Sequence, residues 1–138
     1  MAVRVTPAQR LNSVGQHADM ERSIAVSART TGSAGLYSSV VTTAPGAKTR
    51  IHHHGACETS IYILEGRARY TWGPTGVEDA LEAQAGDFVY IPAGEVHVEE
   101  NAEADRPLVV VLTRNCPDSH VVYVDGGPHG AGDVPSPC

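Results

Sequence analysis

Four side chains in the middle of the chain are of the kinds that bind a divalent metal ion. His52, His54 and Glu58 lie within seven positions, and His97 follows a short apolar segment that ends at Pro92. Imidazole nitrogens and carboxylate oxygens are the usual ligands of first-row divalent metals, and such sites can keep coordination positions open for a substrate. The sequence therefore predicts a metal site with His52, His54, Glu58 and His97 as ligands.

The assignment of these ligands depends on how a β-strand displays its side chains. Alternate residues of a strand face the same side, so His52 and His54 can bind one ion while His53 faces away. Glu58 has the same parity as Tyr62, which places it in the interior if the strand is unbroken. A β-bulge would reverse that assignment. The alternative is a three-histidine site completed by water, with Glu58 nearby.

Two glycine-bounded segments frame these candidates. Residues 46–66 contain Gly-x5-His-x-His-x3-Glu and end at Gly66, and residues 86–101 read Gly-x5-Pro-x-Gly-x2-His-x3-Asn. The pair resembles the two sequence motifs of the cupin superfamily, as found in small single-domain cupins of bacteria. The second motif agrees position by position. The first has seven residues between Glu58 and Gly66 where the cupin pattern has six, so ordinary cupin spacing would select Thr59.

The resemblance implies an all-β fold, an antiparallel double-sheet jelly roll forming a cupin β-barrel. The residues agree independently, because segments rich in β-branched side chains alternate with Gly/Pro turns. We expect strands at residues 23–27, 35–42, 61–72, 88–91, 108–112 and 121–124. Residues 1–125 are expected to form a single cupin domain, and residues 126–138, rich in Gly, Pro and Ser, a flexible tail.

Composition limits the partners and the location of the protein. A formal net charge of −6 argues against nucleic acid, and the lack of an 18-residue apolar run argues against a membrane span. Three irregularly spaced cysteines and an N-terminus unlike a signal peptide indicate a reduced cytoplasmic protein. The resemblance also implies a homodimer, and we expect the apolar strands around residues 24–26 and 36–41 to pair through exposed edges.

The resemblance implies metal chemistry without fixing the reaction, because one scaffold supports many activities. The first hypothesis is a metal-dependent enzyme acting on a small organic substrate, such as an Fe(II) dioxygenase. The second is a non-redox isomerase, cyclase or lyase, and the third is a non-catalytic ligand-binding module. The ion would be a divalent first-row transition metal, with Fe, Mn, Ni, Zn and Cu all open. Glu99 shares the face of His97 and is the candidate acid/base residue; alternatively it belongs to an exposed acidic run.

Overall fold

Two six-stranded sheets make up most of the structure. The computed structural model describes residues 1–15, 18–124 and 133–134. In spatial order the first sheet contains β1 (Leu11–Val14), β2 (Met20–Val26), β3 (Tyr37–Thr43), β10 (Leu108–Arg114), β5 (Thr59–Glu65) and β8 (Phe88–Ile91). The second contains β12 (Asp133–Val134), β11 (Val121–Tyr123), β4 (His52–His53), β9 (His97–Asn101), β6 (Arg67–Trp72) and β7 (Asp79–Gln84).

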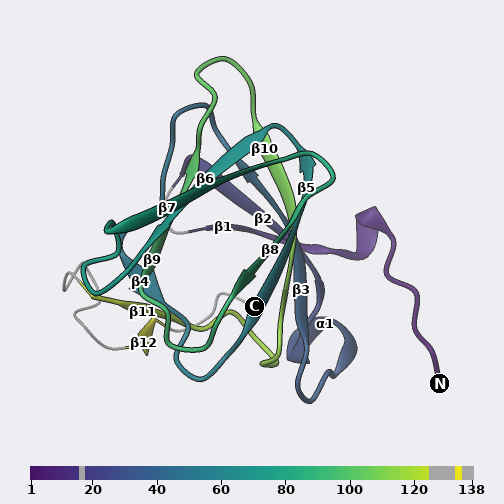
Figure 1. The fold of residues 1–138 in the computed structure, drawn as a ribbon. Helices are drawn as coiled ribbons and strands as arrows, with labels where there is room; N and C mark the ends of the chain where they lie inside the picture. The colour runs from purple at the N-terminus through teal and green to yellow at the C-terminus, as the bar shows by residue number, and fades with distance from the viewer. Residues whose placement is uncertain (16–17, 125–132, 135–138) are drawn as a thin grey trace.

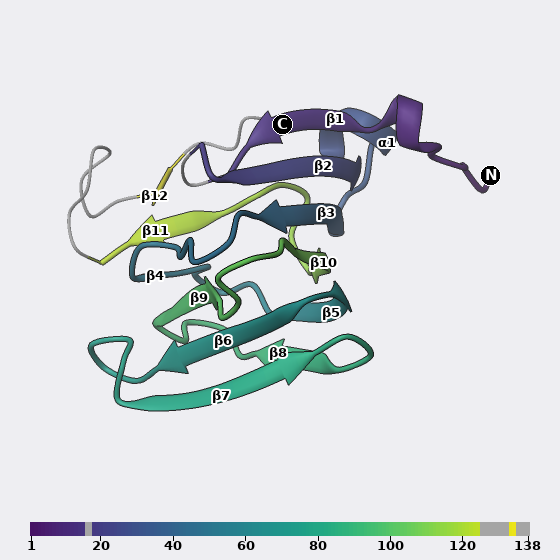
Figure 2. The ribbon, with the colours of Figure 1, turned by 90° about the horizontal axis from the view of Figure 1, so that it is seen from above.

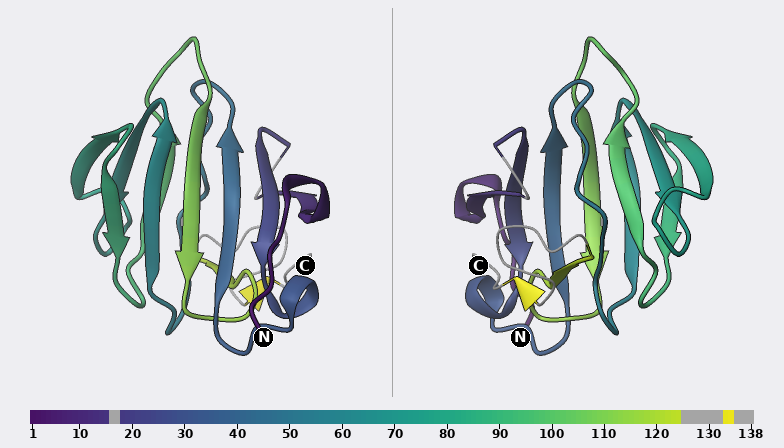
Figure 3. Two further views of the ribbon diagram at one scale, coloured as in Figure 1. Left: turned by 90° about the vertical axis from the view of Figure 1, so that its right-hand side faces the viewer. Right: turned by 90° about the vertical axis from the view of Figure 1, so that its left-hand side faces the viewer.

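The two sheets lie face to face and all named strand pairs are antiparallel (Figure 1). Seen from above, both sheets run in the same direction across the molecule, from β1 and β12 at one end to β8 and β7 at the other (Figure 2). The described residues contain one short α-helix, α1 (Ala28–Thr31), which packs beside β2 (Figure 3), and one 3-10 helix, η1 (Pro7–Gln9), which precedes β1. This is the all-β, double-sheet jelly roll that the sequence predicts.

The core lies between the sheets and is supplied by alternate residues of facing strands. In β3 and β10 the buried and less buried residues alternate strictly, as expected for strands with one face toward a core. The apolar residues fully buried there include Ile24 of β2, Ile63 of β5 and Leu108 of β10. Interior positions at the ends of several strands are polar instead, and these ends surround the site described below.

The long strand expected at residues 61–72 is two strands that belong to different sheets. The pairing of β5 with β10 skips Leu64, which marks a β-bulge, and Gly66 follows with φ of +91°. A side chain at Gly66 could not be accommodated, because a Cβ atom there would lie 2.7 Å from the carbonyl oxygen of Pro107. The bulge and the glycine reverse the side-chain phase: odd residues such as Ile63 face inward in β5, and even residues such as Ala68 face inward in β6.

The strands expected to form a dimer interface are not sheet edges. β2 lies between β1 and β3, and β3 lies between β2 and β10. Ile24 and Val41 are accordingly buried, so that choice of interface strands is wrong. The edges of the first sheet are β1 and β8. The homodimer itself stays a prediction.

Two further expectations concern the ends of the chain and membranes. Most of the predicted tail, residues 126–138, lies outside the described residues; β12 within it pairs with β11. Among the residues that the structure describes, no helix is long and apolar enough to cross a membrane.

Candidate metal centre

Three histidines from two separate segments of the chain meet on the inner side of the second sheet. His52 belongs to β4, His54 follows this strand directly, and His97 begins β9 with His52 as its register partner. All three are buried, and their ring centroids lie 4.3–5.3 Å apart. One ligand nitrogen of each lies within 4.8 Å of the others. The structure thus brings together three of the four predicted ligands.

Each imidazole is held by a hydrogen bond that leaves its other nitrogen available. All three Nδ1 atoms share one kind of partner, a backbone carbonyl oxygen: His52 with Arg50 at 2.7 Å, His54 with His120 at 2.5 Å, and His97 with Glu95 at 2.8 Å. A carbonyl can only accept, so each Nδ1 carries the proton and each Nε2 keeps its lone pair. Such outer hydrogen bonds fix both tautomer and orientation in metal sites.

The surroundings keep these imidazoles neutral. Burial lowers the pKa of His97 to about 4. Burial, followed by the charge of His97, holds the pKa of His52 well below its usual range. For His54, burial and then the charge of Arg114 lower the pKa in the same way. Because only a neutral imidazole can coordinate a cation, the cluster is in the correct protonation state at neutral pH.

Glu58 is not brought to the three histidines. Its side chain is exposed, where Oε1 accepts a hydrogen bond from the Tyr90 hydroxyl at 2.5 Å and Oε2 accepts one from the Asn115 amide at 3.2 Å. The buried neighbour Thr59 faces the interior instead. The predicted inward phase of Glu58 is therefore wrong, because the bulge at Leu64 shifts the parity on which it was based. The arrangement corresponds to the alternative, a three-histidine site.

The other histidines near this segment have different roles. His53 is not part of the cluster, and its Nδ1 accepts a hydrogen bond from the Gly55 N–H at 2.9 Å. His53 thus faces away, as the strand alternation predicts. His120, which the sequence leaves outside any motif, contributes its backbone carbonyl to His54.

Glu99 lies in the interior and not in an exposed acidic run. It is 7% exposed, and its register partner on β6 is the buried Tyr70. Burial raises the pKa of Glu99 to about 7, although nearby Tyr70 and Arg114 act in the opposite direction. Its Oε1 has no hydrogen-bond partner in the structure. A buried carboxyl group that titrates near neutral pH can both donate and accept a proton.

Arg114 is a site residue that the sequence reading missed. It is the last residue of β10 and is 3% exposed. Its Nε donates to Thr59 Oγ1 at 3.0 Å, and its terminal Nη2 lies 3.3 Å from His54 Nε2. The available signal was parity: a charged residue follows Leu108, Val110 and Leu112 on the inward phase of a buried strand. A charge at such a position is rarely accidental, since burying it is costly.

Known proteins share sequence and architecture with this chain. A family model described as the cupin domain matches residues 39–114, more than half of the chain. The chain therefore belongs to the cupin family. A curated relative, the uncharacterized protein MJ1618 of Methanocaldococcus jannaschii, is 36% identical over 75 residues, which cover 54% of this chain and 56% of that protein. The matched segment thus spans little more than half of this relative.

Solved structures with the same architecture include bacterial oxalate decarboxylases. The enzyme of Bacillus subtilis, whose Mn(II) centres have been characterised, matches with a TM-score of 0.69 and 29% identity over 80% of this chain and 29% of that chain. The enzyme of Lactobacillus farciminis in complex with formate matches with a TM-score of 0.72 and 18% identity over 86% of this chain and 34% of that chain. The second likeness is one of fold alone. This chain spans about a third of either enzyme.

The family, the manganese-binding neighbour and the histidine cluster together define a metal-binding cupin. Three neutral imidazoles suit a divalent transition metal, and this donor set does not select one such metal over the others. Among the similar structures, an oxalate decarboxylase is described together with the way it binds its substrate.

Proposed function

We propose that this protein is a metal-dependent enzyme that converts a small organic substrate inside the barrel. The observation that carries the proposal is the convergence of three buried imidazoles, each with Nδ1 fixed by a backbone carbonyl and with an unprotonated Nε2. With His52, His54 and His97 as ligands, a bound metal would keep coordination positions for substrate and would supply Lewis-acid or redox chemistry there.

Glu99 is the residue best placed to move protons in this enzyme. Its carboxyl group is buried on the same strand face as His97, and its Oε1 has no hydrogen-bond partner in the structure, so it could exchange a proton with a bound substrate. This placement favours the non-redox alternative, an isomerase, cyclase or lyase in which the metal polarises the substrate. An Fe(II) dioxygenase is the redox alternative and requires no such group.

Metal analysis followed by an oxygen-uptake screen tests the proposal. Protein purified without added metal is expected to contain close to one divalent ion per chain, and this occupancy should disappear in His97→Ala. Enzyme loaded with Fe(II) or Zn(II) is then screened against small organic acids, sugars and phenols. Turnover with both metals and without oxygen uptake would identify the Lewis-acid chemistry, whereas turnover with iron alone and consumption of oxygen would identify the dioxygenase. Bound metal without turnover of any compound would favour the non-catalytic binding module.

A further inference from the structure

Arg114 places a buried positive charge beside the three histidines without an ion-pair partner among the described residues. Within residues 1–15 and 18–124, no carboxylate forms an ion pair with its guanidinium. The contacts that it does make are with a neutral hydroxyl, Thr59 Oγ1, and a neutral ring nitrogen, His54 Nε2. Two polar contacts leave part of the five-donor guanidinium unused.

A metal ion bound to the three histidines would increase the net positive charge of this site. The lone pair of His54 Nε2 cannot serve a metal and the Arg114 N–H at the same time, so the arginine would lose that acceptor. Since Glu58 lies outside, the three histidines offset none of the charge of a dication, and the buried carboxyl group that interacts with the charge of Arg114 is Glu99. Ionised Glu99 would offset one of the three positive charges of a dication and a guanidinium, so this buried site still favours a further anion.

The neighbouring side chains are consistent with an oxygen-rich ligand at this place. The guanidinium carbon of Arg114 lies 5.7 Å from the centroid of the Tyr37 ring, whose buried hydroxyl has no hydrogen-bond partner. Ser39, on the same inward face of β3, also has a buried hydroxyl without a partner. Buried hydroxyls are nearly always satisfied in folded proteins, so groups like these point to a polar ligand or water.

We propose that Arg114 binds a carboxylate group of the substrate, beside the position where His52, His54 and His97 would hold the metal ion. The inference rests on the proposed function and narrows its substrate to small carboxylic acids. The planar guanidinium suits this task, because it can donate two parallel hydrogen bonds to one carboxylate. Thr59 is the positioning residue, since its hydroxyl holds the Arg114 Nε.

Acetate and its neutral isostere acetamide test the proposal on the manganese-loaded protein. Binding is followed through the EPR signal of the metal, and metal content is measured in the same samples. We expect acetate to bind at least tenfold more tightly than acetamide. In Arg114→Gln the affinity for acetate should fall by roughly 10- to 100-fold while metal content stays the same, because a hydrogen bond to a charged group is lost. Arg114→Lys should lose less affinity for acetate, since lysine keeps the positive charge but lacks the paired N–H donors of the guanidinium.

The control variant is Arg67→Gln, which removes an exposed arginine and should leave acetate binding unchanged. Equal acetate affinity in wild type, Arg114→Gln and Arg114→Lys, all with full metal content, would overturn the inference and leave the proposed function standing. Absence of bound metal from the wild-type protein would overturn both. If Arg114→Gln fails to fold, the comparison of wild type with Arg114→Lys decides, with equal affinity overturning the inference.

Discussion

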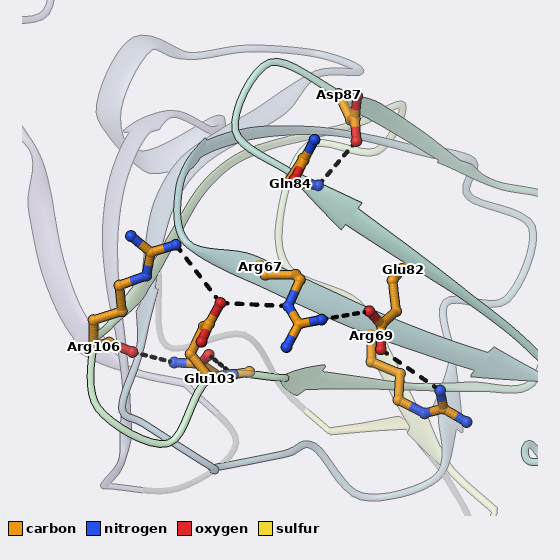
Figure 4. A network of polar contacts seen from close by, with 8 residues as sticks. Arg67, Arg69, Glu82, Gln84, Asp87, Glu103 and Arg106 are labelled. Atoms are coloured by element: carbon orange, nitrogen blue, oxygen red, sulfur yellow. Dashed lines mark hydrogen bonds and ion pairs between the residues drawn. The ribbon is translucent and has the colours of Figure 1, made fainter.

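The arginines on the outer side of β6 and the arginine at the end of β10 have opposite surroundings. Arg67 donates to Glu82 at 2.9 Å and to Glu103 at 3.3 Å, and Arg69 lies 3.9 Å from Glu82 (Figure 4). These side chains are 42–44% exposed, and each cation has a carboxylate beside it. Exposed pairs of this kind contribute about 0–1 kcal/mol each, because water already solvates both charges.

Arg114 is shielded from water and forms no ion pair with a carboxylate of the described residues. It is 3% exposed and its neighbours Thr59 and His54 are uncharged. Burial lowers its pKa from the usual value, which reflects the cost of removing the charge from water. The surface arginines have carboxylates within 4 Å, whereas the buried arginine has no ion-pair partner among the described residues. Proteins keep such unfavourable arrangements at functional sites, at the expense of stability.

The largest effect is expected from the histidines that define the inner region. His54→Ala removes one of three converging nitrogens and should abolish stoichiometric metal binding. His53→Ala, one position away, should retain it, because this ring bonds to the Gly55 N–H and lies outside the cluster. Metal content by inductively coupled plasma mass spectrometry compares the two variants directly. Equal retention by both would show that the cluster is not the metal site.

The second effect concerns turnover and not binding. Glu99→Gln keeps the shape of the buried side chain and removes its ability to exchange a proton. Once a substrate is identified, kcat should fall by roughly 10²- to 10⁴-fold, the usual contribution of a general acid or base, with metal content unchanged. The matched control is Glu100→Gln on the opposite face of β9, which should leave kcat within twofold of wild type. An unchanged kcat in Glu99→Gln would remove Glu99 from the chemistry.

The third effect is on stability, and it differs between the buried arginine and the exposed arginines. In metal-free protein, Arg114→Met should raise the free energy of unfolding by about 1–4 kcal/mol, because an apolar side chain replaces a buried charge that lacks a charged partner. Arg67→Met should lower it by at most about 1 kcal/mol, since only exposed ion pairs are lost. Urea denaturation measures both. Destabilisation by Arg114→Met would show that the hydrogen bond from Arg114 to Thr59 stabilises the fold and that burying the arginine does not reduce the stability of the protein.

The sequence predicts most of the fold and three of the candidate ligands, for reasons visible in particular residues. Spacing places His52 and His54 on one face, and the turn residues after β8 deliver His97 to the start of β9. These inferences need only local geometry. The pairing of β4 with β9, by contrast, is a long-range contact, which the family resemblance supplied and local patterns did not.

The alternation of inward and outward side chains gave a wrong prediction where it was extended across the break between β5 and β6. The assignment of Glu58 counted back from the strand that ends at Trp72, across Gly66 and the bulge at Leu64. One unpaired residue there exchanges the inward and outward faces. For Arg114 the parity of β10 indicates burial, but its contacts with His54 and Thr59 join segments that are distant in the chain. A bulge and a cross-strand contact leave no reliable trace in a single sequence.

The smallest effect on metal binding is expected from Glu58, which the alternation of side chains wrongly assigned to the interior. Glu58→Gln should leave metal content unchanged, because the carboxylate bonds to Tyr90 and Asn115 on the outer side of the sheet. Loss of these exposed contacts should change the free energy of unfolding by no more than about 1 kcal/mol. Thr59→Val is the companion variant: it should also retain metal, yet weaken acetate binding, because the hydroxyl that positions Arg114 is gone. A tenfold or greater loss of metal affinity in Glu58→Gln, with none in Thr59→Val, would mean that the segment before β5 reverses its phase when metal binds. The Glu58 carboxylate would then be a fourth ligand and would add a negative charge to the interior. The contrast between the paired surface arginines and the unpaired Arg114 would then no longer hold.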